Sequence, residues 1–188
     1  MGNVQRTTYP LKLLTFHKSI NFNFITLYLN QYYSMFSEIH KTNYPPSKPI
    51  LIWDGECKFC KWWKTRWEIK TGNLIEFKPY QVATKNFPDI PLDEFKKASR
   101  LIDEKGNVYS GPDSAYKIKE YSGDPKWHNW YISYPWFKSV SNIGYNHIAK
   151  NRNFYYKATV FLFGSEPEKP KIYWFYYLLI VILILISV

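Results

Sequence analysis

The stretch ILIWDGECKFC, residues 50–60, decides how this chain folds. Its first four residues are apolar and lie between a proline-rich segment and an Asp-Gly pair, which predicts a short buried strand. Beyond that pair, Phe59, Trp63 and Trp67 recur every four residues, the spacing that places side chains on one face of a helix. The stretch therefore predicts a strand, a tight turn and a helix whose first turn carries two cysteines.

Shorter patterns after this stretch predict further elements. Apolar runs bounded by polar segments predict strands, and a polar loop that contains Gly106 predicts a β-hairpin. Asp113 or Ser114 is a suitable N-cap for a helix. The predicted elements are a strand at 74–77, a turn and short helix within 88–97, a hairpin of 99–102 and 108–110, and a helix at 113–121.

The composition predicts one folded domain with appendages. The chain has 188 residues, of which 46% are hydrophobic and 20% aromatic, and this is too apolar for a disordered chain. The formal net charge is +10, but the basic residues are spread out, and none of their runs is longer than the pair Lys96-Lys97. We therefore expect no nucleic-acid partner.

Cys57 and Cys60 are the only cysteines, so a multi-bridge disulfide scaffold and a four-cysteine zinc site are excluded. The amide N–H groups and the dipole of a helix N-terminus stabilise negative charge, so Cys57 should ionise more readily than a free thiol. A Cys57 thiolate can attack a substrate disulfide, and Cys60 can then attack Cys57 and release the product. The spacing points to thiol–disulfide exchange, with Cys57 as nucleophile and Cys60 as resolving thiol.

Two other interpretations of the cysteine pair stay open. The pair could be half of a zinc site, but the four histidines, at positions 17, 40, 128 and 147, are distant in sequence and form no closely spaced pair. The cysteines could also be inert buried side chains on an amphipathic helix. The strand–helix context favours redox chemistry over both alternatives, and such a dithiol needs neither a metal nor a cofactor.

The residues around the cysteines resemble a known family. Residues 52–60 are similar to the Asp-Gly-x-Cys-x-x-Cys signature of the DCC family of predicted thiol-disulfide oxidoreductases. Residues 103–115 resemble its hairpin and following Gly-x-(Asp/Glu)-x-Ala segment, and residues 145–152 resemble its closing Tyr-x-x-(Ile/Val)-Ala-x-Asn-Arg segment. The three motifs occur in the family's order and cover roughly residues 48–160.

This resemblance implies an α/β fold of the thioredoxin-like type, with a small mixed sheet flanked by helices. It also implies a dithiol active site at Cys57 and Cys60. One departure is that residues 97–100, before the strand that would face the cysteines, contain no proline, whereas thioredoxin-like proteins usually have a cis-proline there. Docking of substrate against such a proline is therefore not assumed.

Asp54 of the signature has two interpretations. A carboxylate beside a dithiol could relay a proton to the resolving thiol Cys60, which makes Asp54 a candidate catalytic residue. An Asp-Gly pair after a strand is also good turn chemistry, with the carboxylate accepting from the following backbone amides. His147 and Arg152 fall in the closing motif, and we expect structural roles for both.

Composition divides the chain into a poorly ordered N-terminal extension at 1–47, a thioredoxin-like domain at 48–164, a linker at 165–171 and an apolar segment at 172–188. The last segment is uncharged over 17 residues, the lower limit for spanning a hydrocarbon core of about 30 Å, and it starts with aromatic residues. It therefore predicts a C-terminal transmembrane helix. Lys169 and Lys171 beside it predict a membrane protein whose domain lies on the cytoplasmic side.

Together these features predict a membrane-tethered thiol-disulfide oxidoreductase. Its dithiol would exchange with a disulfide-containing protein or a small thiol substrate, and an external reductant would recycle it. The alternative is a non-catalytic, membrane-tethered binding module of thioredoxin-like fold, in which the cysteines are structural.

Overall fold

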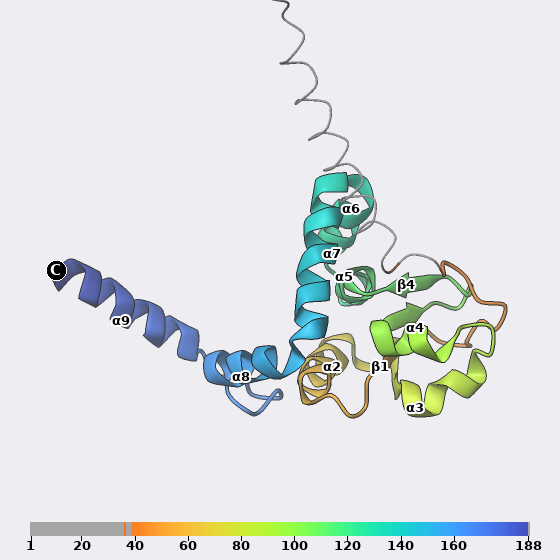
Figure 1. The fold of residues 1–188 in the computed structure, drawn as a ribbon, viewed down its shortest axis with the longest axis horizontal. Coiled ribbons are helices and arrows are strands. Elements are labelled where there is room, and N and C mark those ends of the chain that lie inside the picture. Colours follow the sequence, from red (N-terminus) through yellow and green to blue (C-terminus); the bar gives the residue numbers. More distant parts are fainter. Residues whose placement is uncertain (1–35, 37–38, 188) are drawn as a thin grey trace, which may run out of the picture.

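A computed structural model of the chain describes residue 36 and residues 39–187. The described part starts with strands and short helices and ends in consecutive helices (Figure 1). The strands are β1 (Ile50–Trp53), β2 (Glu76–Pro79), β3 (Arg100–Ile102) and β4 (Val108–Ser110). The helices are α2 (Lys58–Thr71), α3 (Tyr80–Ala83), α4 (Leu92–Lys97), α5 (Pro112–Tyr121), α6 (Lys126–Ser133), α7 (Pro135–Lys150), α8 (Arg152–Phe163) and α9 (Tyr173–Ser187), with 3₁₀ turns at Gly72–Leu74 and Thr84–Asn86.

The strands form one mixed sheet in the order β2-β1-β3-β4. β1 and β2 are parallel and are connected through α2, whereas β3 is antiparallel to both β1 and β4. Leu51, in the middle of β1, lies opposite Phe77 of β2 and Leu101 of β3. The structure thus confirms the small mixed sheet flanked by helices that the sequence predicts.

Alternate side chains of the sheet pack into two separate apolar layers. Ile50, Ile52 and Ile102 belong to one layer, together with side chains from α3, α4 and the turns beside them. Leu51 and Leu101 point the other way and pack with Ile118 of α5 and with Ile75. Figure 1 shows α2 and α5 on one side of the sheet and α3 and α4 on the other. Both faces are therefore covered, and the end of β1, where α2 begins, has a fixed position.

Helices α6, α7 and α8 bring the chain back to the start of α2. Tyr131 of α6 donates a hydrogen bond to Asn142 Oδ1 of α7 at 2.9 Å, so these two helices are joined by a buried polar contact. α7 ends at Lys150 and α8 begins at Arg152, so the chain changes direction at Asn151. This corner lines the same groove as Cys57, at the start of α2.

The second strand and the helices after α5 differ from the sequence prediction. The second strand is predicted at 74–77 but spans Glu76–Pro79, because Leu74 belongs to a 3₁₀ turn and is 56% exposed. Ile75, which is 3% exposed, is the buried apolar residue of the run that predicted this strand. Helices α6 to α8 occupy a region to which the sequence pattern assigns no element.

The predicted C-terminal transmembrane helix is not supported. Within residues 39–187, none of the helices is both long enough and apolar enough to cross a membrane. α9 is apolar, but its 15 residues extend only about 22 Å at ~1.5 Å each, against a hydrocarbon core of about 30 Å. The predictions of a membrane span at 172–188, of a membrane location and of a domain held on the cytoplasmic side are therefore wrong.

The predicted N-terminal extension, residues 1–47, lies mostly outside the described residues. Its described end packs on the β-hairpin, where Val108 donates its N–H to the His40 carbonyl at 2.9 Å and Thr42 donates to the Gly106 carbonyl at 2.8 Å. The Thr42 hydroxyl also donates to the Asp89 carboxylate at 2.8 Å. Residues 40–42 are therefore tied to the domain before β1 begins.

Candidate active site

A tight turn after β1 presents the two cysteines. Asp54 Oδ1 accepts the N–H of Glu56 at 3.1 Å, as in an Asx-turn. Gly55 lies so close to the β2–α3 connection that a Cβ on it would be 2.8 Å from the Pro79 Cβ, which requires glycine here. The Gly55 N–H donates to Gln81 Oε1 at 3.2 Å. The turn is thus held against the neighbouring connection, and this fixes where α2 starts.

Cys57 is the N-cap residue of α2. The backbone N–H of Cys60 donates to Cys57 Sγ at 3.1 Å, so the sulfur takes the place that a serine or aspartate oxygen often has at this position. Both cysteines are free thiols and both are half-buried. The sulfur of Cys57 therefore accepts from an amide that has no partner within the helix. This amide lies at the positive end of the helix dipole, which favours the thiolate form of Cys57.

The two thiols have opposite acidities although only two residues lie between them. Hydrogen bonding from the Cys60 side chain lowers the pKa of Cys57 to about 6 against the effect of burial, and the Cys60 amide and the Arg152 charge lower it further. The pKa of Cys60 is raised instead, because its thiol is the donor to Cys57, is more deeply buried and lies beside the Cys57 charge. At neutral pH, Cys57 is mainly a thiolate and Cys60 a thiol.

Arg152, the first residue of α8, completes the site from a distant part of the chain. Its Nη1 donates to Asp54 Oδ2 at 2.7 Å across a separation of 98 residues. Its Nη2 donates to the Lys96 carbonyl at 3.4 Å, so the guanidinium is held from two sides. A permanent positive charge is thereby fixed near both thiols and favours the thiolate form.

Asp54 accepts hydrogen bonds at both of its oxygens. Oδ1 accepts from the Glu56 amide and, at 3.3 Å, from Gln81 Nε2, while Oδ2 accepts from Arg152. These contacts hold the turn, α3 and α8 together at one carboxylate. Asp54 is thus a structural link between these segments, and the proton relay to Cys60 stays a prediction.

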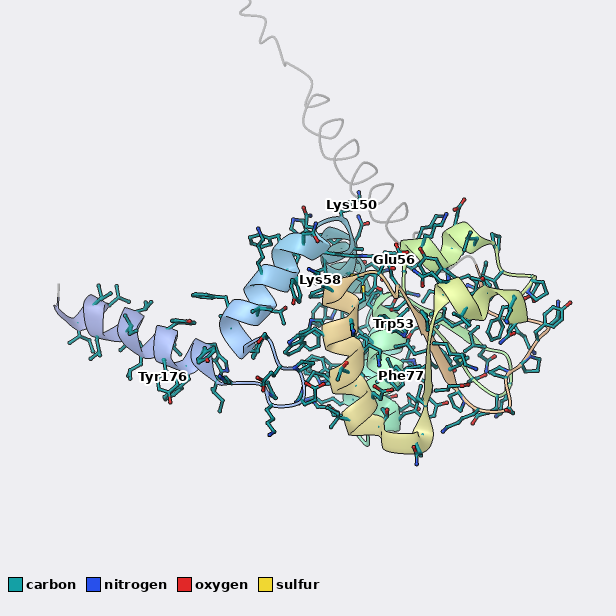
Figure 2. All side chains as sticks on the ribbon, turned by 90° about the horizontal axis from the view of Figure 1, so that it is seen from below. Trp53, Glu56, Lys58, Phe77, Lys150 and Tyr176 are labelled. Carbon is teal, nitrogen blue, oxygen red and sulfur yellow. The ribbon has the colours of Figure 1, made fainter. Side chains whose placement is uncertain are left out.

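Two hollows of opposite character meet at the dithiol. Cys57 lines a groove of about 660 Å³, and Figure 2 shows Glu56, Lys58 and Lys150 gathered at this end of the molecule. Cys60 lines a smaller hollow of about 280 Å³ whose walls are mainly apolar. The two hollows share four wall residues, Asp54, Phe59, Ala149 and Arg152. A molecule bound across these shared residues would contact both sulfurs.

A chain of hydroxyl groups borders the apolar hollow. Ser114 Oγ donates to the Gly111 carbonyl at 2.7 Å, so in its 2.9 Å contact with Ser99 Oγ it must be the acceptor. Ser99 Oγ then has no further proton and accepts from Tyr145 at 3.0 Å, while the Ser99 N–H donates to the Tyr145 oxygen at 3.1 Å. The Tyr145 proton is therefore committed to Ser99 rather than to a thiol, and burial raises the pKa of Tyr145 and keeps it neutral.

The structure brings the three predicted site residues together at one turn. Cys57, Cys60 and Asp54 lie where β1 passes into α2, and their catalytic roles stay predictions. His147 lies apart, with its Nδ1 at 2.9 Å from the Tyr155 hydroxyl, and it lines neither hollow. Arg152, to which the sequence assigns a structural role, belongs to the site, and its place in the closing motif was the only signal for it.

Metal binding at the site has no support from the described side chains. Residues 39–187 contain no group of three or more histidine, cysteine, aspartate or glutamate side chains that could hold a metal ion. The chemistry that the site offers is that of a dithiol beside a guanidinium–carboxylate pair.

Comparison with known proteins agrees with this geometry. A family model described as DCC1-like thiol-disulfide oxidoreductase matches residues 51–158. The matched range runs from β1 into α8 and so includes both cysteines, Asp54 and Arg152. Neither the curated proteins nor the solved structures contain a match to the chain. The family resemblance seen in the sequence is confirmed.

Proposed function

Because the chain belongs to the DCC1-like thiol-disulfide oxidoreductase family, we propose that it exchanges its Cys57–Cys60 dithiol with the disulfide bonds of protein or small thiol substrates. The observation that carries the proposal is the pairing of an acidic thiol at a helix N-terminus with a protonated thiol one turn further on. The family match supports the reaction class, and the geometry supports the order of the steps.

The first step is an attack by the Cys57 thiolate on one sulfur of the substrate disulfide. A Cys57–substrate disulfide forms, the substrate S–S bond breaks, and the other substrate sulfur leaves as a thiolate that takes a proton from solvent. Because the pKa of Cys57 is about 6, the attacking species is already abundant at neutral pH. Cys57 is thus the sulfur that meets the substrate.

The second step is an attack by Cys60 on Cys57. Once the Cys57 sulfur is bonded to substrate, it carries no charge, and the hydrogen bond and the repulsion that keep Cys60 protonated disappear. Cys60 then loses its proton to solvent and attacks Cys57 Sγ; the Cys57–substrate bond breaks, the second substrate sulfur leaves as a thiolate, and a Cys57–Cys60 disulfide remains. An external dithiol reductant reverses the two steps and restores the reduced pair.

Arg152 and Asp54 influence the dithiol without forming bonds to the substrate. The guanidinium stabilises the Cys57 thiolate electrostatically, and the carboxylate holds the guanidinium at 2.7 Å. We assign both as positioning residues.

Trapping of the mixed disulfide tests this order. Cys60→Ser protein incubated with a disulfide-linked peptide should accumulate a peptide adduct on Cys57, seen by mass spectrometry, whereas Cys57→Ser protein should form none. Multiple turnover with peptide and dithiothreitol should fall at least a thousandfold in Cys57→Ser. Equal residual turnover in the two variants would contradict the mechanism.

A non-catalytic binding module is the alternative function. It predicts that both cysteines of the folded protein react slowly with iodoacetamide at neutral pH, whereas the proposed enzyme requires fast alkylation of Cys57 alone.

A further inference from the structure

The hollow beside Cys60 is lined mainly by apolar side chains, which thiol–disulfide exchange itself does not require. Its volume is about 280 Å³, and its walls come from β1, α2, α4, α5, α7 and α8. Its apolar wall residues include Trp53, Phe59, Trp63, Phe95 and Ile148. Except for Phe95, these side chains are half-buried rather than fully enclosed, so the hollow can be reached from solvent.

The polar groups around this hollow are not open to an occupant. The indole Nε1 atoms of Trp53 and Trp63 are buried, and neither has a hydrogen-bond partner among the described residues. The Tyr145 hydroxyl donates to Ser99 Oγ, and the Ser99 hydroxyl donates to Ser114. The hollow therefore offers an occupant a mainly apolar surface.

The size of the hollow restricts its occupant. Sites for drug-sized ligands and cofactors have volumes of about 300–1,000 Å³, so this one is too small for a nucleotide or flavin. It corresponds to roughly nine water molecules at about 30 Å³ each, which is space for one large side chain and an adjoining peptide group. An aromatic or aliphatic side chain fits these mainly apolar walls.

The position of the hollow connects this occupant to the reaction. The apolar hollow contains Cys60 on its wall and shares Asp54, Phe59, Ala149 and Arg152 with the groove of Cys57. A substrate sulfur bonded to Cys57 would therefore lie within a residue or two of the hollow. A bulky apolar neighbour of the substrate cysteine can enter the hollow, whereas a small charged thiol leaves its apolar walls uncovered.

Resting on the proposed function, we propose that this hollow is a substrate-anchoring site that selects peptide disulfides in which the reacting cysteine has a large apolar neighbour. The physiological substrate is thus a protein or peptide disulfide rather than a small polar one.

Single-turnover kinetics of the pre-reduced, full-length protein test this site. The probes are symmetric disulfides of acetyl-Phe-Cys-amide and acetyl-Cys-Phe-amide, matching peptides with Ser in place of Phe, and bis(2-hydroxyethyl) disulfide as an internal reference for the dithiol. We expect the better Phe peptide to react roughly tenfold to a hundredfold faster than its Ser counterpart, the gain that burial of one aromatic side chain supplies.

A variant with two matched controls locates the effect. Ala115→Leu fills the hollow from α5 and should reduce the Phe-to-Ser rate ratio to about threefold or less, whereas Ala115→Ser keeps the space and the ratio. Trp130→Phe, on α6 and outside the hollow, should also leave the ratio unchanged.

The outcomes separate this site from the reaction class. Equal rates for Phe and Ser peptides, in protein that reduces bis(2-hydroxyethyl) disulfide, overturn the anchoring site and leave the proposed function intact. A Phe preference that survives in Ala115→Leu also overturns it. No reaction with any of the disulfides overturns both the proposed function and the site.

Discussion

The two sulfur atoms of the dithiol lie on the same helical turn but in different surroundings. Cys57 faces an amide N–H, a guanidinium and a groove edged by charged side chains, whereas Cys60 faces a small hollow lined by aromatic rings. The pKa of the first is lowered and that of the second raised. The contrast teaches that a Cys-x-x-Cys spacing sets which sulfurs can meet, while the neighbours of each sulfur set which one attacks.

The hydrogen bond from Cys60 to Cys57 makes the largest contribution to this contrast. Cys60→Ala removes the side-chain donor and should raise the pKa of Cys57 from about 6 by about one to two units. Cys60→Ser keeps an O–H donor and should retain most of the low value. Thiolate absorbance near 240 nm, followed against pH, measures both. Identical titration curves for the two variants would show that the side-chain hydrogen bond does not set the acidity.

The charge of Arg152 should have a smaller effect. Arg152→Gln removes a positive charge that lowers the pKa of Cys57, so this pKa should rise by about half a unit to one unit. At pH 6 the rate of alkylation by iodoacetamide should then fall by roughly two- to fivefold.

Arg152→Lys is the matched control for this charge. It should keep most of the rate while losing the second contact of the guanidinium, because a lysine is a single point charge. A loss as large as that in Arg152→Gln would show that the two-sided hydrogen bonding, and not the charge, matters.

The smallest expected effect is on stability. The pKa of Cys57 is lower in the folded protein, about 6, than the ordinary value of 9.0, so its thiolate stabilises the fold fully above pH 9, and this contribution is lost as the pH falls to 6. For reduced protein, the free energy of unfolding should therefore rise with pH across this window. The rise should be at most about 1 kcal/mol, because the sulfur is half exposed and screened by solvent.

Urea unfolding of reduced wild type and reduced Cys57→Ser at several pH values isolates this contribution. The difference between the two proteins should grow from pH 6 to pH 9. Above pH 9 the raised pKa of Cys60 acts in the opposite direction, because an unfolded Cys60 ionises while the folded one stays protonated. A constant difference across the whole range would mean that Cys57 ionises equally in the folded and unfolded chains.

The sequence predicts the parts of the fold that depend on near neighbours. The strand at 50–53, the helix after Cys57 and the hairpin around Gly106 all follow from local periodicity and turn chemistry, and the structure has each of them. The second strand is displaced by two residues because Leu74 is apolar but exposed, and an apolar run alone does not show which of its members are buried. The predicted membrane span is wrong because the apolar segment forms too short a helix.

In the candidate site, too, the contacts between near neighbours in sequence are predictable and the contacts between distant segments are not. Cys57, Cys60 and Asp54 are adjacent in sequence, so their proximity is predictable, whereas the Arg152–Asp54 pair joins segments 98 residues apart. That pairing depends on the corner at Asn151, and so on the packing of α7 and α8, which no local pattern indicates. The apolar hollow is equally non-local, since its wall comes from six separate elements.

The ion pair between Asp54 and Arg152 can form only late in the synthesis of the chain. A ribosome that adds 5–20 residues per second needs roughly 5–20 s to synthesise the chain between these partners. During that interval the nascent chain already contains both cysteines but not the guanidinium that favours the Cys57 thiolate. Cys57 therefore reaches its full acidity only after α8 has been made and has docked, so an incomplete chain carries a smaller fraction of Cys57 thiolate than the finished protein.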